Sequence, residues 1–269
     1  MTSLCISAYQ NPEPLGICLS SLTNQTVSDF KVYVAEDGQD PSVMQKVQEY
    51  SKVLNIEHVS HEDQGYRKSV IHNEVFRRVS DGLLICVDGD TFLHRHFIED
   101  HLNEHARQPG GMFMGRRVEC GPLFCAQITE NNVTEINGGL GLSLLWSGFN
   151  HDSRNVFRAL RTASPILRNL FGRDRVPDLL GSNFSLPIEL MRKVNGYDES
   201  YQAYWGEDGD LFVRIRNLGV PLHGSKGVAL QYHIHHERRE PSAEHQARYQ
   251  ELLKNHSIVR CEDGMEKGL

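Results

Sequence analysis

Short apolar runs alternate with stretches of helical periodicity along the N-terminal third of the chain. The apolar runs occupy residues 4–8, 30–35, 56–59 and 83–87, and each predicts a strand. Between the first two runs, apolar side chains recur at helical spacing at Leu15, Cys18, Leu19 and Leu22. Alternation of strand and helix is typical of a Rossmann-like, mostly parallel sheet, so we predict an α/β fold.

The fourth run ends in two carboxylates separated by a glycine, Asp88-Gly89-Asp90. The uninterrupted run before them predicts a strand buried on both faces. Ligands of open α/β sheets bind beyond the carboxyl ends of the strands, so Asp88 and Asp90 would border such a site. Hard oxygen ligands suit a divalent cation that also holds a phosphate. The alternative is a polar turn, because Asp-Gly is a common turn dipeptide.

Polar residues also follow the other strands of this half. Tyr9 follows the first run and Asp37 ends the second, so both should converge with Asp88 at one edge of the sheet. Neither a Gly-x-Gly-x-x-Gly sequence nor a P-loop is present, which argues against a dinucleotide fold. Arg67 and Lys68 begin a predicted helix and could contact phosphate or ribose, although they could equally be solvated.

A second acidic group lies in the C-terminal half, in the run Tyr204-Trp205-Gly-Glu207-Asp208-Gly-Asp210. Acidic residues are favoured at a helix N-terminus by the helix dipole, so capping is the plain interpretation. Three carboxylates beside a tryptophan exceed what a cap needs, however. Aromatic side chains are also the usual platforms for sugar rings, which points to a carbohydrate site.

Three histidines, His233, His235 and His236, lie on a strand-like run that begins near residue 228. A neutral imidazole beside two carboxylates would complete a site that prefers Mn²⁺ or Mg²⁺ to a soft metal. The chain contains 14 histidines, so a chance cluster is the alternative.

Residues 137–180 follow no single pattern. Within 154–175, arginines interleave with apolar residues, as in peripheral segments that lie on an anionic membrane surface. The alternative is a pair of core-packed helices with a solvated basic face. The arginines are Arg154, Arg158, Arg161, Arg168, Arg173 and Arg175.

Composition narrows the class of protein. The chain has 269 residues, 39% hydrophobic and 23% charged, and a net charge of −7, which argues against a nucleic-acid partner. No apolar stretch approaches the roughly 18 residues of a spanning helix, and no signal peptide is recognisable. Six scattered cysteines fit reduced thiols. We therefore expect a cytoplasmic protein, with peripheral contact to the inner face of the membrane as an option.

Taken in order, seven short motifs resemble the inverting nucleotide-sugar glycosyltransferases of family 2, which have the GT-A fold. The Trp-Gly-Glu-Asp segment is similar to that of galactosyltransferases. The chain has Ala8-Tyr9-Gln10 and Glu36-Asp37-Gly38-Gln39 where the family usually has Thr-Tyr-Asn and Asp-Asp-Gly-Ser. The motifs are Ile6-Ser-Ala-Tyr-Gln, Glu36-Asp37-Gly38, Gly65-Tyr-Arg-Lys, Asp88-Gly-Asp90, Asn195-Gly-Tyr-Asp, Trp205-Gly-Glu-Asp and His233-x-x-His236.

The resemblance implies one GT-A domain over residues 1–240, followed by a helical tail over 241–269. A nucleotide-binding half (1–93) would precede an acceptor-binding half (94–240). Asp90 and His233 would bind Mn²⁺ or Mg²⁺, with His236 as the second choice for the histidine ligand. Asp208 would be the catalytic base. The remaining assignments are the donor contacts Tyr9, Asp37, Arg67, Asp88 and Gly89 and the acceptor contacts Tyr204, Trp205 and Glu207.

The implied reaction moves a sugar from a nucleotide diphosphate, with a UDP-sugar as the expected donor, to a hydroxyl of a glycan or glycolipid. Synthesis of cell-surface polysaccharide or lipopolysaccharide is the implied setting. Two alternatives stay open. A nucleotidyltransferase also grips a metal-bound nucleotide with aspartates, but it should carry a glycine-rich basic loop after the first strand, which is absent. The other is a nucleotide-sugar-binding module without catalysis.

Overall fold

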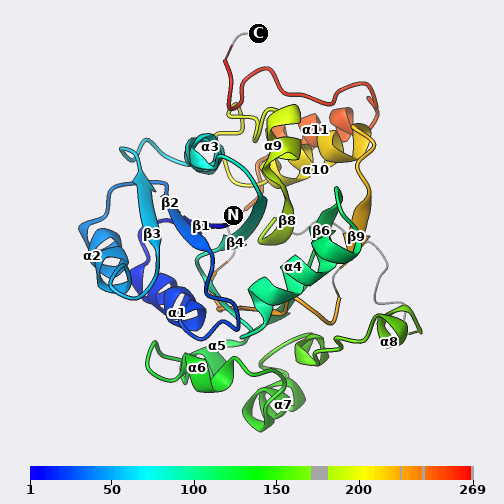
Figure 1. The fold of residues 1–269 in the computed structure, drawn as a ribbon. Coiled ribbons are helices and arrows are strands. Elements are labelled where there is room, and N and C mark those ends of the chain that lie inside the picture. The colour runs from blue at the N-terminus through cyan, green and yellow to red at the C-terminus, as the bar shows by residue number, and fades with distance from the viewer. Residues whose placement is uncertain (171–180, 225, 238–239, 268–269) are drawn as a thin grey trace.

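The four apolar runs of the N-terminal third form four neighbouring parallel strands. In this computed structural model, which describes residues 1–170, 181–224, 226–237 and 240–267, they belong to a seven-stranded sheet (Figure 1). The strand order is β3-β2-β1-β4-β8-β6-β9. Strand and helix alternate as predicted: β1 (Thr2–Ala8), α1 (Pro12–Leu22), β2 (Lys31–Glu36), α2 (Pro41–Tyr50), β3 (Ile56–Ser60), α3 (Lys68–Arg78) and β4 (Leu83–Asp88).

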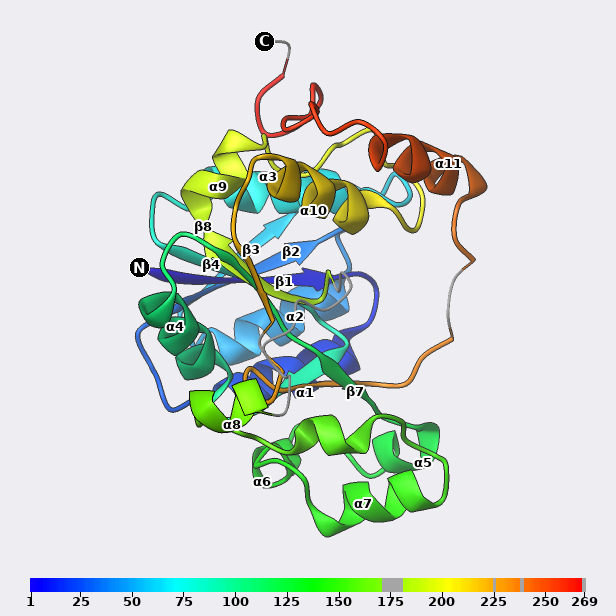
Figure 2. The same cartoon turned by 90° about the vertical axis from the view of Figure 1, so that its right-hand side faces the viewer.

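Helices cover both faces of this sheet, as Figure 2 shows. Alternate strand residues point to opposite faces, so Leu4 and Ile6 pack on α1 and α2 whereas Cys5 packs on α3. The helices α4 (Phe97–Arg107), α9 (Ile188–Lys193) and α10 (Glu207–Asn217) complete the two layers. β4 is buried on both faces, which explains why apolar and polar residues do not alternate along it.

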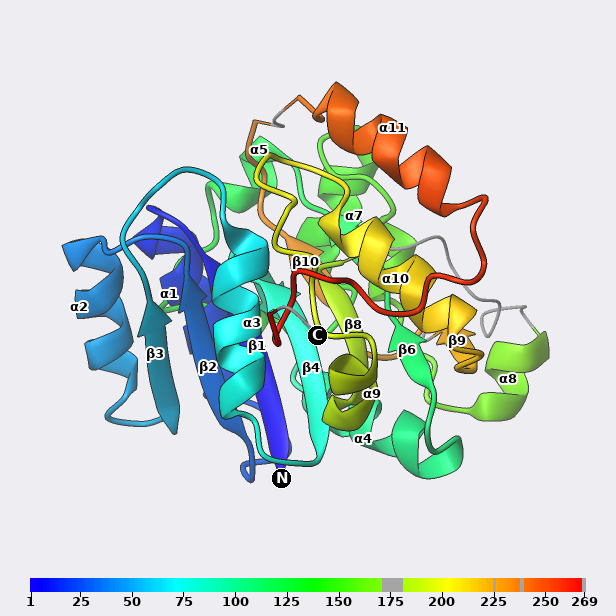
Figure 3. The same ribbon diagram turned by 90° about the horizontal axis from the view of Figure 1, so that it is seen from above.

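The C-terminal half extends the sheet with strands of mixed direction. β8 (Asn183–Pro187) pairs antiparallel with β4 and with β6 (Met112–Met114), while β6 pairs parallel with β9 (Leu222–Gly224). The sheet is therefore mostly parallel on the N-terminal side and mixed on the other (Figure 3). The predicted α/β fold is confirmed.

A second, three-stranded sheet lies at the carboxyl edge of the first. Its order is β5-β10-β7, formed by β5 (Thr91–Leu93), β10 (Gln231–His233) and β7 (Arg117–Glu119). β5 begins immediately after Asp90, and the register places His233 opposite both Thr91 and Glu119. This small sheet therefore brings the histidine run beside Asp90.

A helical unit, residues 120–160, lies below the sheet in Figures 1 and 2. Its apolar core around Phe124, Leu144 and Val156 is shared with the small sheet, which contributes Phe92 and Tyr232. Its elements are α5 (Pro122–Cys125), α6 (Val133–Ile136), α7 (Leu142–Phe149) and the 3₁₀ helix η1 (Val156–Ala159). α8 (Pro165–Leu170) follows. Among the described residues, no helix is long and apolar enough to cross a membrane.

Not all arginines of the segment 154–175 lie on the surface of the protein. The Arg161 Nε donates to Asp100 Oδ2 at 3.1 Å, and Arg168, 1% exposed, donates from Nη1 to Glu104 Oε1 at 2.7 Å. Both carboxylates belong to α4, so these two arginines fix the segment to the domain. Arg173 and Arg175 lie outside the described residues.

The C-terminal tail is helical only in its first part. α11 (Ala243–Leu252) packs against α10, and the chain then runs back without regular helix to residue 267. Its end is tied to α3, because the Arg77 Nε donates to the Met265 carbonyl at 2.7 Å.

Candidate active site

The Asp88-Gly89-Asp90 turn is fixed to the end of β1. The Gly89 N–H donates to the Ser7 carbonyl at 2.9 Å, and the Ser7 hydroxyl donates to Asp88 Oδ1 at 2.9 Å. A Cβ on residue 89 would lie 2.5 Å from the Ser7 carbonyl oxygen, so only glycine allows this approach. Gly89, predicted as a donor contact, thus has a clear structural role here.

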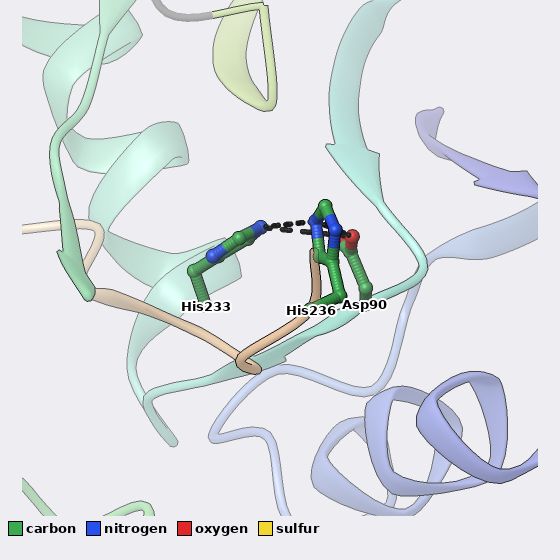
Figure 4. A group of neighbouring side chains, drawn as sticks. All are labelled: Asp90, His233 and His236. Carbon is green, nitrogen blue, oxygen red and sulfur yellow. Dashed lines mark hydrogen bonds and ion pairs between the residues drawn. The ribbon is translucent and has the colours of Figure 1, made fainter. Parts of the chain in front are cut away.

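Asp90, His233 and His236 form one group of candidate metal ligands, which Figure 4 shows. One ligand atom from each lies within 4.8 Å of the others. The His236 Nε2 is 3.0 Å from Asp90 Oδ2, and the His233 Nε2 is 3.6 Å from the same oxygen. The other oxygen, Asp90 Oδ1, is buried and has no hydrogen-bond partner among the described residues.

Glu119 supports this group from behind. Its Oε2 is 3.3 Å from the His233 Nδ1, and its Oε1 accepts from the Arg117 Nε at 2.8 Å. A carboxylate on the second ring nitrogen orients a metal-binding imidazole. Glu119 was not predicted, and the strand register that sets it beside His233 could not be read from the sequence.

The pKa shifts of His233 and Asp90 without a metal ion also show that positive charge is favoured at this position. Burial lowers the His233 pKa, but the bonds to Asp90 and Glu119 outweigh it and raise this pKa to about 9. Burial raises the Asp90 pKa, but both histidines together lower it below its usual range. A carboxylate with one oxygen close to two imidazoles and the other without a hydrogen-bond partner in the described part of the chain is a donor set that suits Mn²⁺. His235 is not in the group, and its backbone N–H donates to the Cys125 sulfur at 3.3 Å.

Lys68 joins the donor side of the site to the acidic segment of α10. Its Nζ lies 3.2 Å from Asp208 Oδ2, 3.5 Å from Glu207 Oε1 and 3.8 Å from Asp88 Oδ1. Burial lowers the Lys68 pKa, but Asp208 and Asp88 more than offset this, so the pKa is raised well above its ordinary value. A cation expected to contact phosphate therefore lies among three carboxylates.

Two tyrosines hold the acidic pair from either side. The Tyr66 hydroxyl donates to Glu207 Oε1 at 2.6 Å, and the Tyr197 hydroxyl donates to Asp208 Oδ1 at 2.7 Å. The backbone at Gly181 is so close that a Cβ there would lie 1.9 Å from Asp208 Oδ2. Sequence reasoning assigned no role to Tyr66, Tyr197 or Gly181, although the Gly65-Tyr-Arg-Lys and Asn195-Gly-Tyr-Asp motifs contain the two tyrosines.

The two carboxylates of this pair differ in proton affinity. Burial and then the charge of Asp208 raise the Glu207 pKa, and Glu207 Oε2 is buried without a hydrogen-bond partner in the described part of the chain. Burial alone would raise the Asp208 pKa, but Lys68 and the Tyr197 hydroxyl lower this pKa below its usual range. Asp208 is therefore ionised at neutral pH, as a general base must be.

The third carboxylate of this segment has a structural role. Asp210 accepts from the Arg214 Nε at 2.6 Å, and the Arg214 Nη1 also donates to the Val194 carbonyl at 2.6 Å. Trp205 has a left-handed backbone (φ 84°), and its carbonyl lies 2.9 Å from the His245 Nδ1. Tyr204 is partly exposed and meets Tyr66 edge to face, with ring centroids 6.2 Å apart.

The remaining predicted donor contacts lie near the ends of β1 and β2. Asp37 is buried, with Oδ1 2.8 Å from the His61 Nε2 and Oδ2 accepting from the Arg67 backbone N–H at 2.7 Å. The Arg67 side chain donates to Gln64 Oε1 at 3.0 Å. The Tyr9 hydroxyl donates to Asp63 at 3.2 Å. All three positions thus border the same edge of the sheet as Asp88.

Family comparison agrees with this arrangement. Residues 3–124 match the family described as "Glycosyl transferase family 2", and residues 163–237 match the "N-terminal domain of galactosyltransferase". Residues 3–124 thus resemble glycosyl transferase family 2. The first match contains the Asp88-Gly89-Asp90 turn, and the second contains both the Trp-Gly-Glu-Asp segment and His233.

Among curated proteins, the chain is 26% identical to validoxylamine A glucosyltransferase of Streptomyces hygroscopicus subsp. jinggangensis, over 88% of this chain and 57% of the relative. It is 33% identical to chondroitin synthase of Escherichia coli, over 86% of this chain and 34% of the relative. The chain thus spans about half of the first relative's length and about a third of the second's.

Solved structures share the fold. S. aureus TarS 1–349 in complex with UDP superposes with a TM-score of 0.63, at 14% identity, over 94% of this chain and 64% of that one. The mannosyltransferase PcManGT from Pyrobaculum calidifontis, in complex with GDP-Man and Mn²⁺, gives a TM-score of 0.56 at 13% identity, over 91% and 59%. The GT-A fold expected from the motifs is therefore confirmed.

Proposed function

We propose that this protein transfers a sugar, with inversion, from a nucleotide diphosphate to a hydroxyl of a glycan or glycolipid, and that it needs a divalent cation. The observation that carries the proposal is that Lys68 joins the two motifs: its Nζ lies 3.8 Å from Asp88 Oδ1 and 3.2 Å from Asp208 Oδ2. Two acidic groups far apart in sequence thus meet at one edge of the sheet. A UDP-sugar is the expected donor, a choice supported by the UDP complex of TarS.

Inverting transfer requires a stabilised leaving group and a base on the opposite face of the sugar. In this proposal Asp90 and His233 hold the cation, with His236 as a further candidate, and Glu119 orients His233. When bound, Mn²⁺ or Mg²⁺ supplies Lewis-acid stabilisation of the leaving diphosphate. The Mn²⁺ complex of PcManGT supports the choice of ion.

The other residues act directly on donor and acceptor. Asp37, with Tyr9 and Arg67 beside it, binds the base and ribose, and Asp88 with Gly89 borders the ribose and diphosphate. This set receives the nucleotide-sugar donor.

On the acceptor side, Tyr204 and Trp205 pack against the sugar, and Glu207 binds its hydroxyl groups. Asp208 takes the proton of the attacking hydroxyl at Oδ2, the oxygen that faces Lys68. Lys68 keeps Asp208 ionised until that step, since it lowers the pKa of this carboxyl.

The experiment is a panel of donors, UDP-sugars and GDP-mannose, incubated with purified protein with and without Mn²⁺. Release of the nucleoside diphosphate with one donor, dependent on the cation and lost in Asp208→Asn, is the expected result. Binding of UDP without release from any donor would favour a non-catalytic binding module. Release of pyrophosphate from a nucleoside triphosphate would favour a nucleotidyltransferase.

A further inference from the structure

Two residues with left-handed backbone lead into α10 on the acceptor side. Trp205 has φ 84° and Gly206 has φ 111°, and α10 begins directly after them at Glu207. Glycine adopts this conformation freely, whereas tryptophan does so only where its surroundings hold it there. The backbone of this pair sets the direction of the Trp205 side chain and of the first turn of α10. The contacts that hold Trp205 therefore also set the geometry of the acceptor side.

The C-terminal helix α11 supplies these contacts. The His245 Nδ1 lies 2.9 Å from the Trp205 carbonyl oxygen, and because a carbonyl only accepts, this nitrogen carries the proton. The ring of Tyr249 meets the Trp205 ring edge to face, with centroids 5.6 Å apart. Residues four apart share one face of a helix. The Ser242 N–H, at the start of α11, donates to the Tyr204 carbonyl at 3.1 Å. α11 thus contacts both aromatic residues of the acceptor side.

The contact between α10 and α11, which lie side by side in Figure 3, is close. A Cβ on Gly206 would lie 2.8 Å from the Tyr201 ring and 3.1 Å from the His245 Cβ. A Cβ on Gly209 would lie 2.8 Å from the Tyr249 ring. His245 itself is only 5% exposed. Glycines at both positions therefore let α11 approach the acceptor segment closely enough to fix its backbone.

We propose that α11 is part of the acceptor site, and that His245 and Tyr249 are positioning residues that hold Trp205 against the acceptor sugar. The inference rests on the proposed function, in which Trp205 contacts the acceptor. α11 lies outside the ranges 3–124 and 163–237, so these contacts come from a part of the chain that the family models do not cover. The metal ligands and donor contacts belong to other elements. α11 should therefore control acceptor affinity and leave donor affinity unchanged.

The first measurement observes Trp205 alone. The chain has two tryptophans, so the variant Trp146→Phe leaves Trp205 as the single emitter. In this background, His245→Phe should shift the Trp205 emission and increase its quenching by acrylamide, because the hydrogen bond to the Trp205 carbonyl is lost. His245→Asn should restore the emission, since its amide N–H can take the place of the Nδ1–H.

The second measurement separates acceptor from donor kinetics. Methyl β-glycosides of glucose, galactose, N-acetylglucosamine and glucuronic acid serve as acceptor probes with the donor that releases its nucleotide. His245→Phe and Tyr249→Leu should raise the KM for the accepted glycoside about tenfold, with kcat and donor KM changed less than about threefold. A platform that binds ground state and transition state alike alters KM alone.

Leu252→Ala is the matched control. Leu252 is 7% exposed on the same helix, about two turns beyond His245. This variant should lower the urea midpoint of unfolding and leave the Trp205 emission and the acceptor KM at their wild-type values.

Unchanged Trp205 emission in His245→Phe would overturn the proposal, as would an unchanged acceptor KM or an equal rise of this KM in Leu252→Ala. A parallel loss of donor affinity would also overturn it, because α11 would then only stabilise the domain. Wild-type protein that releases no nucleotide from any donor rejects the proposed function instead. In that case the emission of Trp205 still decides the positioning, through its shift in His245→Phe and its recovery in His245→Asn.

Discussion

The metal end and the acceptor end of the site are built in opposite ways. At the metal end, Asp90 keeps one buried oxygen without a hydrogen-bond partner among the described residues, and its neighbours are two histidines. At the acceptor end, both oxygens of Asp208 are already held, one by Tyr197 and one by Lys68. The first set leaves an oxygen open to a cation from outside, whereas the second already contains a cation, Lys68.

A histidine near each end shows the same contrast. Burial, together with Lys68, lowers the His72 pKa to about 3, while the carboxylates around His233 raise its pKa to about 9. One imidazole is kept neutral beside an internal cation, and the other is kept protonated where a metal ion would bind. The two ends should therefore respond differently to metal removal, substitution and pH.

The largest effect should come from removing the carboxylate at the metal end. Asp90→Ala should abolish transfer, because it removes a direct ligand and with it several kcal/mol of leaving-group stabilisation. EDTA should do the same to wild type, and Mn²⁺ should restore only wild type. Nucleotide release that survives EDTA unchanged would remove the metal from the mechanism.

At the acceptor end, Asp208→Asn should lower turnover by roughly 10²–10⁴-fold, the usual contribution of a positioned base. Donor affinity, measured by calorimetry, should stay near normal, because the substitution is almost isosteric and away from the metal ligands. Glu207→Gln should instead raise the apparent KM for acceptor. Normal turnover in Asp208→Asn would leave Glu207, with its raised pKa, as the base.

Lys68→Met tests whether the internal cation matters. Without it, the pKa of Asp208 should rise, so the acidic limb of the pH–rate profile should move to higher pH and turnover should fall by about 10–100-fold. Lys68→Arg should leave the acidic limb of the pH–rate profile close to its wild-type position. Because breaking a buried ion pair destabilises by about 3–5 kcal/mol, urea unfolding must accompany the kinetics. An unshifted profile would contradict the assignment.

The histidines at the metal end should differ among themselves. His233→Ala should raise the Mn²⁺ concentration for half-maximal activity by about 10–100-fold, whereas His235→Ala should change it little, since His235 is not in the ligand group. His236→Ala is the informative third variant. If His236→Ala has a larger effect than His233→Ala, His236 is the main histidine ligand and His233 the secondary one, and the fold assignment is unaffected.

The smallest effect concerns stability and pH without metal. His72 has a folded pKa near 3 and an unfolded pKa of 6.5, so its contribution is lost as pH falls below 6.5. His233, with a folded pKa near 9, stabilises at low pH, and this contribution is lost as pH rises through 9.

Each group should change the unfolding free energy by about 1.4 kcal/mol per pH unit in its own window. Urea midpoints from pH 4 to about pH 9 would measure both slopes. His72→Leu should flatten the acid side, and His233→Gln the alkaline side. Retention of the acid slope in His72→Leu would assign it to other buried histidines such as His101, whose pKa burial also lowers.

The N-terminal half could be predicted because its signals are local. Continuous apolar runs of strand length, alternating with amphipathic helices, specify a parallel sheet, and the chemistry at its carboxyl edge follows from that topology. Asp37, Asp88 and Asp90 became candidate site residues in this way, and Glu207 and Asp208 did so from an acidic run beside a tryptophan. The resemblance to family 2 supplied the roles, and the family comparison confirmed the class.

The sequence by itself determined the α/β sheet, the edge that bears the site and the residue types gathered there. Tertiary structure alone decided the partners: Lys68 meets Asp208 from 140 residues away, and Arg161 and Arg168 turn inward to α4 instead of outward. It also separated His236 from His235, because β10 ends at His233 and the chain turns back toward Asp90. These pairings depend on contacts between distant segments, and the hydrophobic periodicity of one segment does not determine which side chain of another segment it will contact.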